Sequence, residues 1–158
     1  MKLVTLLVAA VLSTSTAAED QRIPPTNPAL QYIGNEMSGE AVFLEATTFG
    51  RYQDHGFAWM LVMYPDELKP TWIREIMDCM TGVITDDYIV WLDPTTLQAF
   101  GQSDQGFPMQ ARTRRPAGPN SIDQKMVRAA CSGKPLNMGE PLYGVQAAVD
   151  WVASHLRR

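Results

Sequence analysis

The sequence predicts an α+β domain: an antiparallel meander of about six strands precedes two C-terminal helices, which pack on one face of the sheet. Short apolar segments separated by turn residues fill the first two thirds of the chain, and helical periodicity occurs only in the last third. Two cysteines, Cys79 and Cys131, add one expected disulfide. The 158 residues are 46% hydrophobic and 19% charged, a composition that excludes a disordered or fibrous protein.

The first 18 residues have the three-part layout of a secretory signal peptide. Lys2 precedes an apolar run from Leu3 to Leu12, and small residues lead to a cleavage site after Ala18 or, nearly as well, after Ala17. This apolar run is too short to span a bilayer, which needs about 20 residues. We therefore expect residues 1–18 to be removed on export, and the mature chain to have no membrane insertion.

Residues 19–29 are expected to form an extended leader, because Pro24, Pro25 and Pro28 disfavour regular structure there. Residues 30–158 then make a single α+β domain. Turn-forming residues divide its first part into six candidate strands: Leu30–Ile33, Glu40–Glu45, Phe57–Tyr64, Trp72–Met80, Tyr88–Leu92 and Leu97–Phe100.

The residues within and between these segments refine the prediction. The nearly unbroken apolar run Phe57–Tyr64 indicates a central strand that is buried on both faces, with Asp54-His55-Gly56 as the turn leading into it. Interspersed charged residues in Trp72–Met80 favour a strand with one solvent-facing side. Asp86-Asp87 predicts a turn before the next strand.

Helical signals occupy the last third of the chain. Ser121 and Gln124 form a capping box, and Gly133 is placed to terminate the helix that follows. Cys131 lies at the end of that helix, so a disulfide would fasten the helix to a strand. A second amphipathic helix is defined by the spacing of Val145, Ala148, Val149, Val152 and Leu156.

A structural disulfide is the expected role of the two cysteines. It would close a loop of 53 residues and stabilise the fold by about 4 kcal/mol. Redox chemistry requires two cysteines separated by two residues, which this chain lacks. A soft-ligand copper site is disfavoured because methionines three apart on a strand, such as Met60 and Met63, point to opposite faces. We therefore expect no metal.

The motifs of common enzyme classes are absent from the sequence. It has neither a phosphate-binding loop, nor a dinucleotide fingerprint, nor a nucleophile elbow, and its two histidines, His55 and His155, are expected to be exposed. We therefore predict a non-enzymatic protein without a cofactor. The formal net charge of −4 and the pI near 5.1 exclude general nucleic-acid binding.

Arg112, Arg114 and Arg115 form the only basic cluster, in a loop that contains proline and glycine. Residues 19–93 carry 13 acids and 4 bases, whereas residues 94–158 carry 4 acids and 8 bases. The arginines either pair with the acidic half of the chain or bind an external anion, since guanidinium groups match carboxylates, sulfates and phosphates. Likewise, the two halves either neutralise one another or form a dipolar surface.

The order of several short motifs resembles the surface-adhesin protein E family of small exported proteins from Gram-negative bacteria. The resemblance covers residues 30–133 and rests on Tyr32-Ile33-Gly34, Val42–Glu45, Thr47-Thr48-Phe49, Arg51, Trp59, Asp78-Cys79, Pro119, Ser121 and Ala130-Cys131. It implies a six-stranded antiparallel sheet backed by helices, a Cys79–Cys131 disulfide and no catalytic residues. Named members of this family bind host extracellular proteins.

The sequence therefore favours an exported envelope protein of the surface-adhesin E type, located in the periplasm or at the cell surface. Its expected partners are host or envelope proteins or anionic polymers, contacted in part through Arg112, Arg114 and Arg115. The alternative is a periplasmic small-ligand-binding or envelope accessory protein, with a pocket between the sheet and the C-terminal helix. A hydrolase would require a histidine or carboxylate pair that meets in space.

Overall fold

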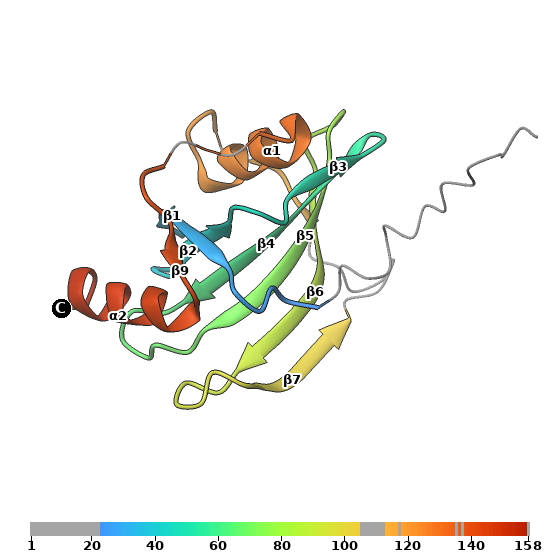
Figure 1. Ribbon diagram of the computed structural model, residues 1–158. Helices are drawn as coiled ribbons and strands as arrows, with labels where there is room; N and C mark the ends of the chain where they lie inside the picture. The colour runs from blue at the N-terminus through green and yellow to red at the C-terminus, as the bar shows by residue number, and fades with distance from the viewer. Residues whose placement is uncertain (1–22, 105–112, 117, 135, 137, 158) are drawn as a thin grey trace, which may run out of the picture.

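The sheet is antiparallel throughout, and its longest strands follow one another in the order of the chain (Figure 1). The computed structural model describes residues 23–104, 113–116, 118–134, 136 and 138–157; the predicted signal peptide lies outside these residues. The elements are β1 Ala29–Asn35, β2 Ala41–Glu45, β3 Gly50–Tyr52, β4 His55–Met63, β5 Thr71–Asp78, β6 Ile84–Leu92, β7 Ala99–Asp104, β8 Thr113–Arg114, α1 Ile122–Ser132, β9 Leu142–Tyr143 and α2 Val145–His155.

The strand order is β7-β6-β5-β4-β2-β1-β9, with β3 beside β4 and β8 beside β6. The predicted α+β fold and antiparallel sheet are confirmed. Five of the six predicted strands are present, as β1, β2, β4, β5 and β6. The sixth, predicted at Leu97–Phe100, is displaced: Leu97 has a φ of 56° in the loop before β7, which covers Ala99–Asp104. The sequence signals missed three strands of only two or three residues, β3, β8 and β9. β1 begins at Ala29, one residue earlier than predicted.

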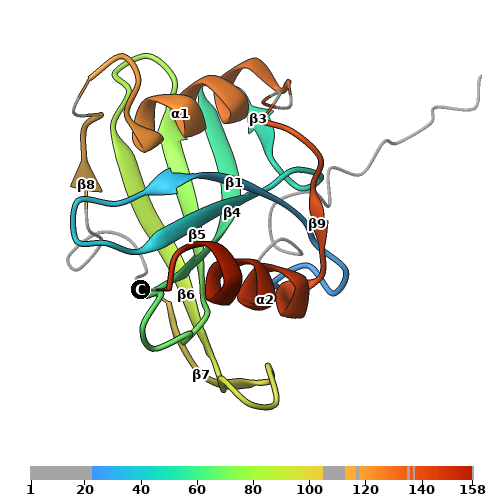
Figure 2. The same ribbon diagram turned by 90° about the vertical axis from the view of Figure 1, so that its left-hand side faces the viewer.

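The two helices cover opposite faces of the sheet, so the prediction that both pack on one face is wrong. Along β4, Ala58 and Met60 belong to the core under α1, whereas Trp59 and Leu61 belong to the core under α2. Successive side chains of a strand point to opposite faces, which places the helices on either side. Figure 2 shows the β1–β2 pair running between them. A sheet with apolar residues on both faces needs a cover on each.

The structure differs from the prediction where charged residues lie within strands. Arg74 and Glu75 are 7% and 0% exposed, so β5 lacks the predicted solvent-facing side. Asp86 and Asp87 lie inside β6 rather than in a turn. An irregularity in the register leaves Asp87 without a paired residue in the backbone ladder with β5. Arg74 Nη1 lies 3.0 Å from Asp87 Oδ2, and this buried ion pair compensates part of the desolvation of both groups.

The turn into β4 also differs from the prediction. Tyr52 pairs with His55, so Gln53 and Asp54 form the hairpin turn, while His55 and Gly56 already belong to β4. Gln53 has a φ of 54°, in the left-handed region. The expected exposure of His55 at this end of the sheet is confirmed.

Both predicted helices form where their sequence signals place them. The Ser121 side chain accepts a hydrogen bond from the N–H of Gln124 (3.2 Å), and Gly133 ends α1 with a φ of 63°. In α2, Ala148, Val149 and Val152 are buried against the sheet. The described residues include no helix with the length and apolar character needed to cross a membrane.

The predicted disulfide is present between Cys79 and Cys131, with 5.6 Å between the Cα atoms. Cys79 directly follows β5, and Cys131 lies in the last turn of α1, so the bond fastens this helix to the sheet. Nothing in the sequence predicts a second anchor, the buried carboxylate of Glu45. That carboxylate accepts hydrogen bonds from the N–H groups of Ala29 (3.1 Å), Thr47 (3.0 Å) and Thr48 (2.6 Å), which fixes the loop after β2.

Candidate functional site

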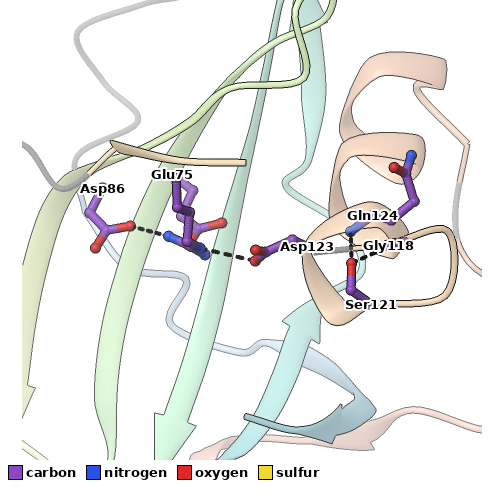
Figure 3. Close-up of polar contacts among 7 residues, drawn as sticks. Glu75, Asp86, Gly118, Ser121, Asp123 and Gln124 are labelled. Carbon is purple, nitrogen blue, oxygen red and sulfur yellow. Dashed lines mark hydrogen bonds and ion pairs between the residues drawn. The ribbon is translucent and has the colours of Figure 1, made fainter. Parts of the chain in front are cut away.

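Arg114 lies inside an ionic cluster between the sheet and the first turn of α1. β8 places it beside β6, because Arg114 pairs with Ile84 in the sheet. Its Nη1 donates to Asp86 Oδ1 (2.7 Å) and its Nε to Asp123 Oδ1 (3.0 Å), and its Nη2 donates to Glu75 Oε1. Figure 3 shows the three carboxylates converging from β5, β6 and α1. The guanidinium therefore connects two strands to the helix.

Three carboxylates share one cation in this cluster, and Glu75 is the most deeply buried of them. Its side chain is 1% exposed, compared with 9% for Asp86 and 15% for Asp123. Burial raises the pKa of Glu75 to about 8; Arg114 opposes this shift and Asp86 adds to it. Burial lowers the pKa of Arg114, but the three carboxylates outweigh it and hold that pKa above its ordinary value. Glu75 is thus the group that carries a proton at neutral pH.

The cluster and the disulfide fix α1 at both of its ends. Arg114 holds Asp123 in the first turn, and the disulfide holds Cys131 in the last. Between them, Lys125 Nζ donates to the carbonyl oxygen of Ile33 on β1 (2.9 Å). Gly56 permits the close approach of the helix, since a Cβ at this position would lie 2.8 Å from the Ala130 Cβ. The side chains on the outer side of α1 are therefore presented on a rigid base.

The exposed charges around α1 are mainly positive. Arg115 precedes the helix, Arg128 lies on its outer side, Lys134 follows it, and Arg51 of β3 contacts the Cys131 carbonyl oxygen (Nη1 to O, 3.4 Å). We call these four exposed residues the α1 cationic surface. Asp54 forms a loose ion pair with Arg51 (3.8 Å), and Asp123 is occupied by Arg114. Among the described residues, Asp54 is the one carboxylate that forms an ion pair with any of these four cations.

The three predicted binding arginines have different places in the structure. Arg112 lies outside the described residues. Arg114 uses all three of its nitrogens within the ionic cluster, so it pairs with the acidic half of the chain rather than with an external anion. Arg115 is exposed. The acidic and basic halves thus neutralise one another in part, through the ion pair of Asp86 with Arg114.

Sequence reasoning missed the carboxylates that hold Arg114. The available signal was a charged residue in an otherwise apolar strand, such as Glu75 between Ile73 and Met77. Glu75 and Asp86 are cross-strand partners and form a carboxylate pair. Arg114 binds both, and they are 0% and 7% exposed. The geometry of this pair suits a structural ion cluster, because a substrate could not reach it without opening the core.

Two further expectations concern α2. The pocket proposed between this helix and the sheet is filled, since Ala148, Val149 and Val152 pack directly into the core with Leu61. A cleft of about 540 Å³ lies instead beyond the helix end, where it is lined by polar residues that include Tyr64 and Arg157. His155 is exposed as expected, and its ring stacks on Trp151 with centroids 4.7 Å apart.

Comparison with known proteins gives no match: neither a family model, nor a curated protein, nor a solved structure is similar to this chain.

Proposed function

We propose that the chain is an exported, non-enzymatic contact protein of the surface-adhesin E type, which binds an anionic partner through the α1 cationic surface. The observation that carries the proposal is that four exposed cations, Arg51, Arg115, Arg128 and Lys134, lie on or beside a helix that is anchored at both ends. The partner class is an anionic polymer or an acidic segment of a host or envelope protein. The site of action is the periplasm or the cell surface.

The charge distribution supports this partner class. The whole chain has a formal net charge of −4, so a positive surface on it is a local feature. Guanidinium groups bind sulfates and carboxylates with two parallel hydrogen bonds, which favours arginine over lysine at such surfaces. A rigid base also reduces the entropy lost when the partner binds.

Export supports the location. The N-terminal residues have the layout of a signal peptide, and the Cys79–Cys131 disulfide is of the kind that persists in an oxidising compartment. A disulfide that holds the contact helix would make the surface dependent on that compartment.

Heparin is a suitable probe for the proposal, because it is a polyanion with closely spaced sulfates. We expect the mature, oxidised protein to be retained on heparin and to elute earlier as the salt concentration rises. The Arg115→Ala/Arg128→Ala variant should bind about tenfold more weakly, since both side chains are exposed and replacing them leaves the core intact.

The matched control is Lys69→Ala/Arg157→Ala, which removes two exposed cations distant in sequence from α1 and changes the net charge by the same amount. This control should bind as the wild type does. Equal weakening of both variants would show that only net charge matters. Equal retention by both would remove the α1 cationic surface from the proposed function.

A further inference from the structure

β7 forms one end of the described sheet, and no described strand pairs with its outer side. Among the described residues, it pairs only with β6. Lysine, proline and β-bulges protect open strand edges against pairing with another chain. The six residues of β7, Ala99–Asp104, include no lysine or proline, and its bulge is confined to Phe100. The register slips near Leu92 so that Phe100 has no partner on β6, and Gly101 to Asp104 continue in regular pairing.

Aromatic side chains lie beside this edge. Trp91 on β6 pairs with Gly101, and a Cβ on Gly101 would lie 3.2 Å from Cε3 of the indole. The absence of a side chain at Gly101 thus lets the Trp91 ring lie over the β7 backbone. Trp91 is 38% exposed and Phe100 is 71% exposed, so both rings are accessible to a partner beside this edge.

A hollow of about 360 Å³ adjoins these two aromatic residues. Tyr64, Pro70 and Pro94 contribute to its lining together with Trp91 and Phe100. Its charged lining residues are Glu67, Lys69 and Asp93. Lys69 pairs with Glu67 at 2.8 Å, which leaves Asp93 as the excess charge. The hollow is therefore apolar and weakly negative.

We propose that the β7 edge binds an extended segment of a partner protein, which adds a strand to the sheet and places apolar side chains in the adjoining hollow. Backbone hydrogen bonds along Gly101–Asp104 would supply affinity, and the Trp91–Phe100 hollow would select alternate apolar side chains. Lysine or arginine beside the apolar residues would complement Asp93. A second copy of this chain fits less well, because it would bring two acidic proteins and two negative hollows together. This site does not depend on the α1 cationic surface.

A capped heptapeptide of alternating valine and threonine, flanked by lysines, tests the proposal with the mature, oxidised protein. We expect binding with a Kd below about 1 mM, and shifts of the β7 backbone amide signals in NMR spectra. The same peptide with every backbone nitrogen methylated should not bind, because it cannot donate to the strand edge. No binding by the first peptide, or equal binding by the second, would overturn the proposal.

Two single substitutions locate the binding site. Phe100→Ala should weaken binding of the lysine-flanked peptide about tenfold. Tyr143→Ala is the matched control, because Tyr143 is 75% exposed on β9, the strand at the opposite end of the sheet. This control should leave the Kd unchanged, and equal weakening by both would overturn the proposal. Sedimentation of the free protein tests whether a second copy of this chain binds the β7 edge instead. A dimer that Phe100→Ala dissociates would identify that second copy as the occupant and would also overturn the proposal.

Discussion

The two helices have the same length but are held on the sheet by different interactions. α1 has a side-chain cap at Ser121, an ion pair from Asp123 to Arg114, and a disulfide at Cys131. α2 has no side-chain bond at its N-cap, Gly144, and is held mainly by apolar packing. Both helices contain eleven residues, so length does not explain the difference.

The comparison shows how the two helices suit different roles. α2 buries Ala148, Val149 and Val152, and the Trp151 ring packs against Tyr32 at a centroid distance of 4.6 Å. The Trp151 and Tyr32 rings are tilted by 38° and are not stacked, and apolar packing of this kind is nondirectional and fills a core. The anchors of α1 are directional, and they fix its outer side relative to the sheet. A contact surface benefits from that fixed geometry, since the cations need no reordering on binding.

The largest expected effect comes from removing the covalent anchor of α1. Cys79→Ser/Cys131→Ser should lower the free energy of unfolding by about 4 kcal/mol, because the unfolded chain regains the freedom of a 53-residue loop. Denaturant titration measures this loss, and hydrogen exchange should show that the amides of α1 lose more protection than those of α2. The neighbouring substitution Met80→Ala, at an exposed side chain, is the control. A change below about 1 kcal/mol in the double variant would contradict the role assigned to the disulfide.

The second effect is a dependence of the protein's stability on pH, which arises from Glu75 in the ionic cluster around Arg114. Glu75 has a pKa of about 8 in the folded protein, above its ordinary value of 4.5. Between pH 4.5 and pH 8, the folded protein therefore keeps a proton on Glu75 that the unfolded chain has released. The resulting stabilisation is present below pH 4.5 and is lost as the pH rises towards 8. Between about pH 5.5 and 7.5, the wild type should lose about 3 kcal/mol of stability, at about 1.4 kcal/mol per pH unit.

Glu75→Gln should remove this slope, because a neutral amide takes the place of the protonated carboxyl and still accepts from Arg114. Unfolding titrations at both pH values measure the difference. The control Asp54→Asn replaces an exposed carboxylate and should keep the wild-type dependence of stability on pH. Parallel pH profiles for the wild type and Glu75→Gln would show that Glu75 is ionised in the folded protein at both pH values.

Local signals in the sequence were sufficient for the helices and most of the longer strands, but not for the short strands β3, β8 and β9. Alternating and continuous apolar segments predicted five of the six longer strands, and Ser121 and Gly133 predicted the ends of α1 within a residue. The disulfide followed from the presence of two cysteines in a chain with a signal peptide. Each of these signals lies within a few residues of the structure that it predicts, or depends on composition alone.

The arrangement of the elements was harder to predict because it depends on contacts between distant residues. An amphipathic helix indicates that it has a buried side, but not which face of the sheet it covers. Asp86 and Asp87 resembled a turn because their partners, Arg114 and Arg74, lie 28 and 13 positions away. The candidate site was predicted in part: Arg115 is exposed as a contact residue must be, whereas Arg114 is structural. Arg51 and Arg128 join the surface only through the packing of β3 and α1.

The smallest of the three effects tests the cap that α1 has and α2 lacks. Ser121→Ala removes the acceptor of the Gln124 N–H and should cost about 1 kcal/mol, whereas Ser121→Asp keeps an acceptor and should retain most of the stability. Ser154→Ala is the matched control in α2: this exposed hydroxyl donates to the Asp150 carbonyl oxygen, so its loss should change stability by less than about 0.5 kcal/mol. Thermal unfolding of the three variants measures the differences. Equal effects of Ser121→Ala and Ser154→Ala would mean that the Ser121 cap does not stabilise α1. The disulfide and the Arg114 cluster would then be the anchors that distinguish α1 from α2.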